Sequence, residues 1–284
     1  MLAMPSAHRF IRHASLPHLE LRTAEGSSDC YQTHTHEEYA FGVVLSGRAL
    51  FSHGSASTPL SAGMTVMMEP GLAHACNPDT QQSWSYRMLF VDAHWLHRSF
   101  LPFASGSSPQ PLRLRKHSSQ AMALFKALNR IADGLLAPQP DPLELDELLL
   151  DFIARHALVP RSDEPQDLTP TRGEPVGLAK VRALIDAQLE SSLALEQLAA
   201  LGGWSEFQLI RRFKQAYGQT PHAYQIDQRL NRAKKLLRQG LPLSEIAQQL
   251  GFVDQSHFQR HFKQRHATTP KHYQGSGTAQ RRVR

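Results

Sequence analysis

Two segments of the sequence, IRRFKQAYGQTPHAY at 210–224 and QRHFKQRHATTPKHY at 259–273, carry the same pattern 49 residues apart. Both are basic, and both place a run of helix-forming residues before a turn. The positions at which they agree are Arg211 and Arg260, Phe213 and Phe262, Lys214 and Lys263, Gln215 and Gln264, Thr220 and Thr269, Pro221 and Pro270, and Tyr224 and Tyr273. The repeat predicts one basic helix-and-turn unit that is built twice.

The residues before the first copy predict a complete helical hairpin. In ALEQLAALGGWSEFQLIRRFKQAYG (194–218) a short apolar helix meets a turn at Gly202 and Gly203. Ser205 then caps a second helix, and Gln208, three residues on, completes a capping box. The second copy, LSEIAQQLGFVDQSHFQRHFKQRHA (243–267), repeats the plan with Asp254 as its cap. This order of elements is typical of a helix-turn-helix, whose second helix enters a major groove.

A single amphipathic helix is predicted between the two motifs, in HAYQIDQRLNRAKKLLRQG at 222–240. About 17 helical residues span roughly 25 Å. A rod of that length can hold two recognition helices about one turn of DNA apart, roughly 34 Å. The spacing of the repeat therefore fits two successive major grooves.

The charge of the chain is concentrated at the same end. Residues 178–284 hold 17 Lys and Arg against 7 Asp and Glu, whereas residues 1–177 hold 14 against 18. A basic module of this kind is the electrostatic footprint expected for binding a polyanion. Two cysteines are too few for a disulfide framework, and no apolar run reaches the ~20 residues of a membrane span. We therefore expect a cytoplasmic protein with no membrane contact.

The chain divides at PRSDEPQDLTPTRGEPV (160–176), which is rich in proline and poor in large apolar residues, as a linker is. Upstream, short β-rich runs such as YAFGVVLSG (39–47) and GMTVMMEPG (63–71) predict a small barrel or sandwich. Two amphipathic helices over 119–137 and 141–158 predict a hairpin packed on it, with Asp141 as the cap of the second helix. A surplus of apolar residues on that hairpin could also serve a dimer.

Residues 178–275 resemble the double helix-turn-helix DNA-binding domain of the AraC/XylS transcription regulators, above all in IAQQLGFVDQSHFQRHFKQRHATTPKHY (246–273). Ala267 departs from the usual glycine, which predicts a less sharply turned helix end. Ala194 and Pro242 stand where a capping Ser or Thr is common. The resemblance assigns contacts with DNA to Phe207, Gln208, Ile210, Arg211, Lys214, Gln255, Ser256, His257, Gln259, Arg260 and Lys263. Arg and Gln can bind guanine and adenine edges, whereas the two Lys are expected to meet phosphate.

In the first part, HTHEEYAFGVVLSG (34–47) would place His34, His36 and Glu38 on one side of a strand, and His74 follows later. Two His from one strand, a carboxylate and a third His are the ingredients of a metal site, and the arrangement resembles the cupin barrel. The spacing of Glu38 differs from that of cupin enzymes, and WSYRMLFVDAHWL (84–96) is closer to the effector-binding barrel of AraC-type regulators. A cupin-type metalloenzyme fused to a DNA-binding module remains the alternative.

The resemblance implies an α+β protein of two domains: a cupin-like β-barrel with a helical hairpin over 1–160 for effector binding and dimerisation, a linker over 161–176, the DNA-binding domain over 177–275 and a basic tail over 276–284. It implies a transcription factor and not an enzyme, with no cofactor or metal. The partners implied are operator DNA, a small-molecule effector, a second copy of the chain and RNA polymerase. The expected lining of the effector pocket is aromatic with a few polar groups, as suits a small ligand: His36, Tyr39, Phe41, His74, Trp84, Tyr86 and Arg87.

Overall fold

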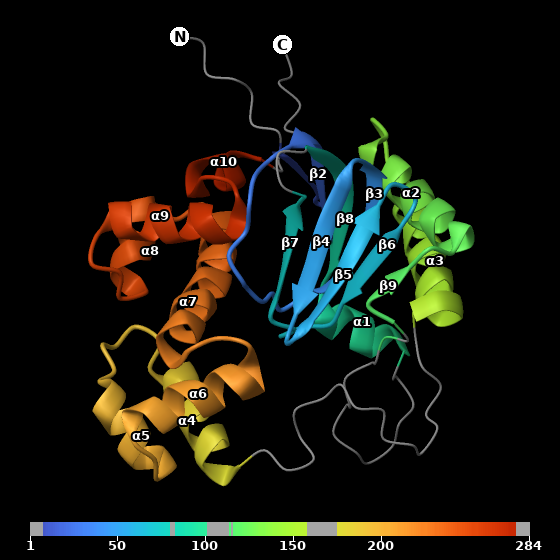
Figure 1. Cartoon of the computed structure of the whole chain (residues 1–284). Helices are drawn as coiled ribbons and strands as arrows, with labels where there is room; N and C mark the ends of the chain where they lie inside the picture. Colours follow the sequence, from blue (N-terminus) through green and yellow to red (C-terminus); the bar gives the residue numbers. More distant parts are fainter. Residues whose placement is uncertain (1–7, 80–82, 101–113, 115, 158–174, 277–284) are drawn as a thin grey trace.

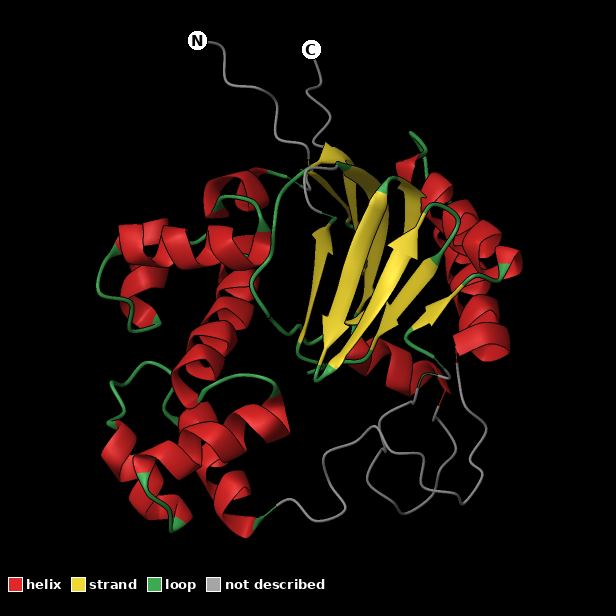
Figure 2. Cartoon of the chain, viewed as in Figure 1, coloured by secondary structure: helices red, strands yellow, loops and turns green. Residues whose placement is uncertain are grey.

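Two halves of different architecture make up this protein, as the computed structural model shows (Figure 1). The described residues are 8–79, 83–100, 114, 116–157 and 175–276. The first half holds two antiparallel sheets and a helical hairpin, and the second half is helical throughout its described residues (Figure 2). This confirms the predicted α+β class with a β-rich first part and an all-α second part. The predicted linker falls almost wholly outside the described residues.

The β-rich half consists of a larger and a smaller sheet that face each other. The larger has the strand order β1-β2-β8-β3-β6-β9 and the smaller β5-β4-β7. The predicted barrel is therefore two separate sheets packed face to face rather than one closed ring. The strands are β1 (His8–His13), β2 (Leu16–Ser27), β3 (Tyr39–Ser46), β4 (Arg48–His53), β5 (Ala56–Ser61), β6 (Thr65–Met68), β7 (His74–Pro78), β8 (Trp84–Val91) and β9 (Ser118–Ser119).

The larger sheet is buried on both faces. Side chains that alternate along a strand point to opposite faces, and β3 divides its residues in this way between two apolar clusters. Ala40 and Val44 join the cluster between the two sheets, whereas Tyr39, Phe41 and Val43 join the cluster under the helical hairpin. The first six residues of β3 are consequently all buried.

The hairpin of α2 (Met122–Leu136) and α3 (Pro142–Phe152) covers the outer face of the larger sheet (Figures 1 and 2). The Asp141 side chain caps α3 by accepting hydrogen bonds from two backbone N–H groups, as predicted, and a π-helical turn, η1 (Ile153–Ala157), continues the chain. Leu128 is 3% exposed and packs on the sheet. Packing on the sheet thus accounts for much of the apolar stripe, and the dimer stays a prediction. A further helix, α1 (Ala93–Phe100), follows β8.

The helical half contains the two predicted hairpins and the rod that joins them. Its helices are α4 (Val176–Ala187), α5 (Leu195–Gly202), α6 (Glu206–Tyr217), α7 (Pro221–Arg238), α8 (Leu243–Gln249), α9 (Gln255–His266) and α10 (Pro270–Gly275). Ser205 forms the predicted capping box on α6, and Asp254 caps α9. Ala194 and Pro242 provide no side-chain cap to α5 and α8.

The end of α9 differs from the expectation drawn from Ala267. This alanine adopts the left-handed conformation, with φ of 48°, and its N–H bonds to the carbonyl of Lys263. Gly218 ends α6 in the same manner, with φ of 71° and a bond to Lys214. The turn is therefore as sharp after α9 as after α6. Alanine adopts this conformation at a steric cost that glycine avoids.

No helix among the described residues is long and apolar enough to cross a membrane.

Candidate DNA-reading helices and effector cavity

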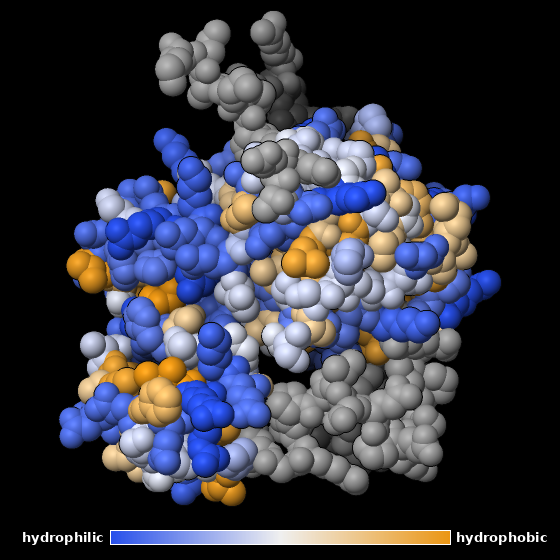
Figure 3. Space-filling model, in the orientation of Figure 1, coloured by the Kyte–Doolittle hydropathy of each residue, from blue (hydrophilic) through white to orange (hydrophobic). Residues whose placement is uncertain are grey.

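The second helix of each motif exposes most of the side chains that the sequence assigns to DNA. On α6, Leu209 and Phe213 are fully buried, which turns the opposite face outward. On α9, Phe258 and Phe262 do the same. Ile210, His257 and Gln259 are half-buried. The exposed members of the set are Phe207, Gln208, Arg211, Lys214, Gln255, Ser256, Arg260 and Lys263. Figure 3 shows apolar surface among hydrophilic surface in the region of α5 and α6. On α6, the side chain of Phe207 is 74% exposed.

One of these side chains, His257, belongs to a polar row along α9. Arg265 Nη1 lies 3.2 Å from Nδ1 of His261, and the Nε2 atoms of His261 and His257 are 2.9 Å apart. Because arginine only donates, Nδ1 of a neutral His261 accepts, and its Nε2–H donates to His257. Arg265 in turn lies 3.9 Å from the buried carboxylate of Asp227 on α7. The row thus connects a predicted DNA contact to the connecting rod.

A cavity of about 40 Å³ lies among strands of the two sheets and the segment that precedes β3. Its volume is enough for a few water molecules. Aromatic and sulfur-containing side chains supply most of the wall, together with one arginine and three histidines. The lining residues are Arg22, Tyr31, His34, His36, Met68, His74, Cys76, Trp84, Tyr86, Met88 and Phe90.

The structure brings together four of the seven residues expected in the pocket: His36, His74, Trp84 and Tyr86. The other three lie beyond the larger sheet. Tyr39 and Phe41 pack under the hairpin, and Arg87 donates to Asn129 and Asp133 of α2. The reason is the alternation of side chains along β3 and β8, which turns these residues away from the cavity.

Sequence reasoning missed most of the remaining lining residues. On β8, Trp84, Tyr86, Met88 and Phe90 stand at every second position and all line the cavity, so a strict two-residue period would have found the last two. Arg22 comes from β2, and no local pattern in the sequence marks it as a lining residue.

The histidines of the cavity share one hydrogen-bonding arrangement. Nδ1 of His34, His36 and His74 lies 2.8–2.9 Å from a backbone carbonyl oxygen, of Gln32, Glu38 and Leu72 respectively. Burial lowers the pKa of His74 to about 4 and those of His34 and His36 well below the usual value. At neutral pH these three imidazoles are therefore uncharged, with the proton on Nδ1.

Glu38 does not join these histidines, which corrects the expectation that it shares their side. Its carboxylate faces α7, 3.2 Å from Nζ of Lys234 and 3.3 Å from Nη2 of Arg238. Burial raises its pKa, but the two cations lower it more, to about 2. Within the described part of the chain, no group of three or more His, Cys, Asp or Glu side chains is arranged to hold a metal ion.

Residues 31–38, called the coupling segment below, lie between the cavity and the helical half. Tyr31, His34 and His36 line the cavity. The residues between them bond to helices. The backbone N–H of Gln32 donates to the carbonyl of Gln264 at the end of α9 (3.0 Å), and the carbonyl of Thr33 accepts from Gln219 just after α6 (3.2 Å).

Thr35 of the coupling segment contacts α7. Thr35 donates to Oδ2 of Asp227 from its backbone N–H (2.9 Å) and from its hydroxyl (2.6 Å), and Asn231 donates to the same hydroxyl (3.1 Å). Asp227 is 1% exposed, and burial raises its pKa to about 6 against the opposing effects of Thr35 and Arg265. A single short segment thus touches the cavity, the rod and the region at the end of each recognition helix.

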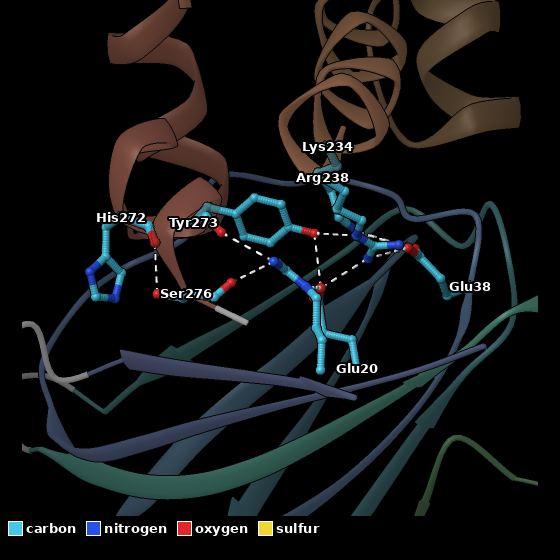
Figure 4. Close-up of polar contacts among 8 residues, drawn as sticks. Glu20, Glu38, Lys234, Arg238, His272, Tyr273 and Ser276 are labelled. Atoms are coloured by element: carbon cyan, nitrogen blue, oxygen red, sulfur yellow. Dashed lines mark hydrogen bonds and ion pairs between the residues drawn. The ribbon is translucent and has the colours of Figure 1, made fainter. Parts of the chain in front are cut away.

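A second junction between the halves is built around Glu20 of β2 (Figure 4). Its Oε2 atom accepts from Arg12 Nε (2.5 Å), from Arg238 Nη2 (3.0 Å) and from the hydroxyl of Tyr273 (3.0 Å). Arg12 also donates to the carbonyl of Ser276 (2.6 Å). Burial raises the pKa of Glu20, but Arg238 and Arg12 lower it further, so that it lies below its usual value. This buried carboxylate therefore joins the sheet to α7 and α10.

In comparisons with known proteins, each half of the chain matches a family model. The family model described as the AraC-like ligand binding domain matches residues 16–153, and that described as a helix-turn-helix domain matches residues 198–276. The uncharacterized regulator YbfI of Bacillus subtilis (strain 168) is 26% identical over 84% of this chain and 86% of its own length. The probable regulator LumQ of Photobacterium leiognathi is 25% identical over 87% of this chain and 93% of its own length.

Solved structures agree on the fold. Apo ToxT from Vibrio cholerae superposes with a TM-score of 0.56 at 14% identity, over 94% of this chain and all of that one. ToxT from the same organism with an unsaturated fatty acid bound superposes with a TM-score of 0.54 at 13% sequence identity, over 92% of this chain and 95% of that one.

Two matched modules in this order define a DNA-binding transcriptional regulator with an N-terminal ligand-binding domain, and not an enzyme. The chain belongs to the AraC family of transcriptional regulators.

Proposed function

We propose that this regulator responds to a small-molecule effector that binds in the cavity and changes how the helical half engages DNA. The observation that carries the proposal is the coupling segment. Its side chains Tyr31, His34 and His36 line the cavity, while Thr35 bonds to Asp227 of α7. A ligand that moves the wall formed by this segment also changes its contacts with the rod. Such a ligand shifts the equilibrium only as far as its affinities for the two arrangements differ.

We further propose that α6 and α9 each read one of two successive major grooves. The 18 residues of α7 give the rod a length of about 27 Å, which suits helices held one turn of DNA apart. Arg211 and Arg260 occupy equivalent exposed positions and suit guanine edges. Lys214 and Lys263, one turn further along, suit phosphates. The domain limits follow this division: 1–160 for sensing, 161–176 as linker, 177–275 for DNA and 276–284 as a basic tail.

A row of polar side chains connects the coupling segment to α9, the second helix that we assign to DNA reading. It runs from Thr35 through Asp227, Arg265 and His261 to His257. Thr35 and Asp227 are joined by hydrogen bonds, as are Arg265, His261 and His257, whereas Asp227 and Arg265 interact as an ion pair at 3.9 Å. A change at the coupling segment therefore reaches a residue that we assign to DNA.

The experiment is a screen for compounds that change the affinity of the full chain for its selected duplex, followed by Thr35→Ala. This variant removes the hydroxyl that bonds to Asp227 and Asn231 but keeps the backbone contact. Allosteric couplings are typically about 1–3 kcal/mol, or 5- to 150-fold in affinity. We expect Thr35→Ala to reduce the response to an active compound severalfold while the compound still binds.

The control is Thr58→Ala, at a half-buried position of β5 in the smaller sheet. Its response should match that of the wild type. If no compound that binds residues of the cavity alters DNA affinity, effector control is wrong. If Thr35→Ala responds fully, the coupling segment is not the route.

A further inference from the structure

Three residues that line the cavity each carry a buried polar atom with no hydrogen-bond partner among the described residues: Nε of Arg22, Nε1 of Trp84 and Nε2 of His36. All three side chains are deeply buried, with 7%, 1% and 4% of their surface exposed. Folded proteins leave few buried polar groups unpaired, because each costs the free energy of its desolvation. Three around one cavity indicate a site built for a polar ligand.

The chemistry of the three atoms is defined. Arg22 and Trp84 can only donate through these nitrogens. His36 holds its proton on Nδ1, which lies 2.9 Å from the carbonyl oxygen of Glu38, so its Nε2 is an acceptor. The residues that line the cavity therefore hold two unpaired N–H donors and one unpaired acceptor.

Arg22 adds a positive charge that no carboxylate contacts within the described part of the chain. Its Nη2 donates to the hydroxyl of Tyr31 (2.7 Å) and to the carbonyl of His266 (2.8 Å), and the carboxylates of Glu20 and Asp29 act on it only at longer range. The neighbouring His34, His36 and His74 are uncharged at neutral pH. A buried cation of this kind is best compensated by an anion.

We propose that the cavity binds a small hydroxycarboxylate, whose carboxylate accepts from Arg22 and Trp84 and whose hydroxyl donates to His36. The inference rests on the proposed effector function and names its ligand class. Phe90, Met68 and Met88 supply apolar contact for a short or aromatic body. Binding widens the cavity from its present 40 Å³, and flexible methionine side chains are suited to that repacking.

Arg22 also connects the cavity directly to α9. The carbonyl that it holds belongs to His266, the last residue of α9. A carboxylate on Arg22 competes with or reorients this hydrogen bond. The ligand thus acts on the second reading helix directly as well as through the coupling segment.

The test is calorimetric titration of the full chain with lactate and with 2-, 3- and 4-hydroxybenzoate. Each is paired with its amide, which lacks the charge, and with propionate or benzoate, which lack the hydroxyl. A hydrogen bond to a charged group contributes about 10- to 100-fold in affinity. We expect at least one hydroxycarboxylate to bind tenfold or more tightly than both of its counterparts.

Two variants locate the binding. Arg22→Gln should abolish the preference for the acid over the amide, and Arg22→Lys should restore part of it. Since Arg22 also supports Tyr31 and His266, Trp84→Phe serves as the second variant, because it keeps an aromatic ring and removes only the N–H. Trp84→Phe should weaken the binding of the hydroxycarboxylate severalfold. Arg48→Gln, at an exposed position of β4, is the matched control and should leave binding unchanged.

The outcomes separate this inference from the effector proposal. Absence of binding by every hydroxycarboxylate, or equal binding by the amides, overturns the ligand class. Unchanged affinity in Trp84→Phe and Arg22→Gln overturns the site. If a hydroxycarboxylate binds with the expected preference but leaves DNA affinity unchanged, the ligand class stands and effector control fails.

Discussion

Replacing Phe258 with Ala is expected to lower the free energy of unfolding of the second helix-turn-helix motif by ~3–5 kcal/mol. The side chain is fully buried on α9, and its ring lies 5.2 Å from that of Phe252 and 5.8 Å from that of Phe262, between centroids. Truncation leaves a cavity in a small core, and the surroundings relax only in part. Urea unfolding followed by circular dichroism measures the loss.

The control is Phe207→Ala, which removes the same atoms from a side chain that is 74% exposed on α6. Surface substitutions of this kind usually change stability by no more than about 0.5 kcal/mol. Equal losses in the two variants would contradict the assignment of Phe258 to the core and of Phe207 to the outer face of the reading helix.

Replacing Glu20 with Gln is expected to cost ~3 kcal/mol and to loosen the junction between the halves. Removing one partner of a buried ion pair typically costs about 3–5 kcal/mol, because the other charge stays buried. Here Arg12 loses its carboxylate, and Arg238 loses one of its two carboxylates. The lower end of that range applies, since the Arg238 side chain is 32% exposed and keeps its contact with Glu38.

Denaturant unfolding gives the energy, and small-angle scattering gives the separation of the halves. The matched control is Glu37→Gln, whose partner Lys235 is 56% exposed while Glu37 itself is 49% exposed. Exposed pairs contribute only about 0–1 kcal/mol. If both variants behave alike and neither widens the molecule, the Glu20 cluster does not hold the halves together.

The helical half could be predicted almost completely from the sequence because its signals are local. Caps at Ser205 and Asp254, and apolar residues three and four apart, each act within one turn of chain. Of the eleven residues that line the cavity, four were predicted to do so. Since β3 is buried on both faces, its residues show no alternation of apolar and polar type, and the sequence does not tell which face of the sheet meets the cavity.

The contacts between the halves could not be predicted at all. Glu20 meets Arg238 and Tyr273 across more than 200 residues of chain, and Thr35 meets Asp227 across 192. No local pattern in the sequence pairs any of these residues with its partner. Only the packing of α7 and α10 against the β-rich half brings these residues together, and Figure 4 shows the contacts of Glu20 with Arg238 and Tyr273.

Hydroxyl-radical footprinting of the full chain on its selected duplex tests the central claim, that both copies of the repeat read DNA. We expect two protected patches on one face of the duplex, about 10 base pairs apart. Arg211→Ala should weaken one patch and Arg260→Ala the other, each at a cost of ~1–3 kcal/mol, whereas Lys214→Ala and Lys263→Ala should weaken specific and non-specific duplexes alike. A single protected patch that is insensitive to Arg260→Ala would show that the second copy is structural, and would contradict the account.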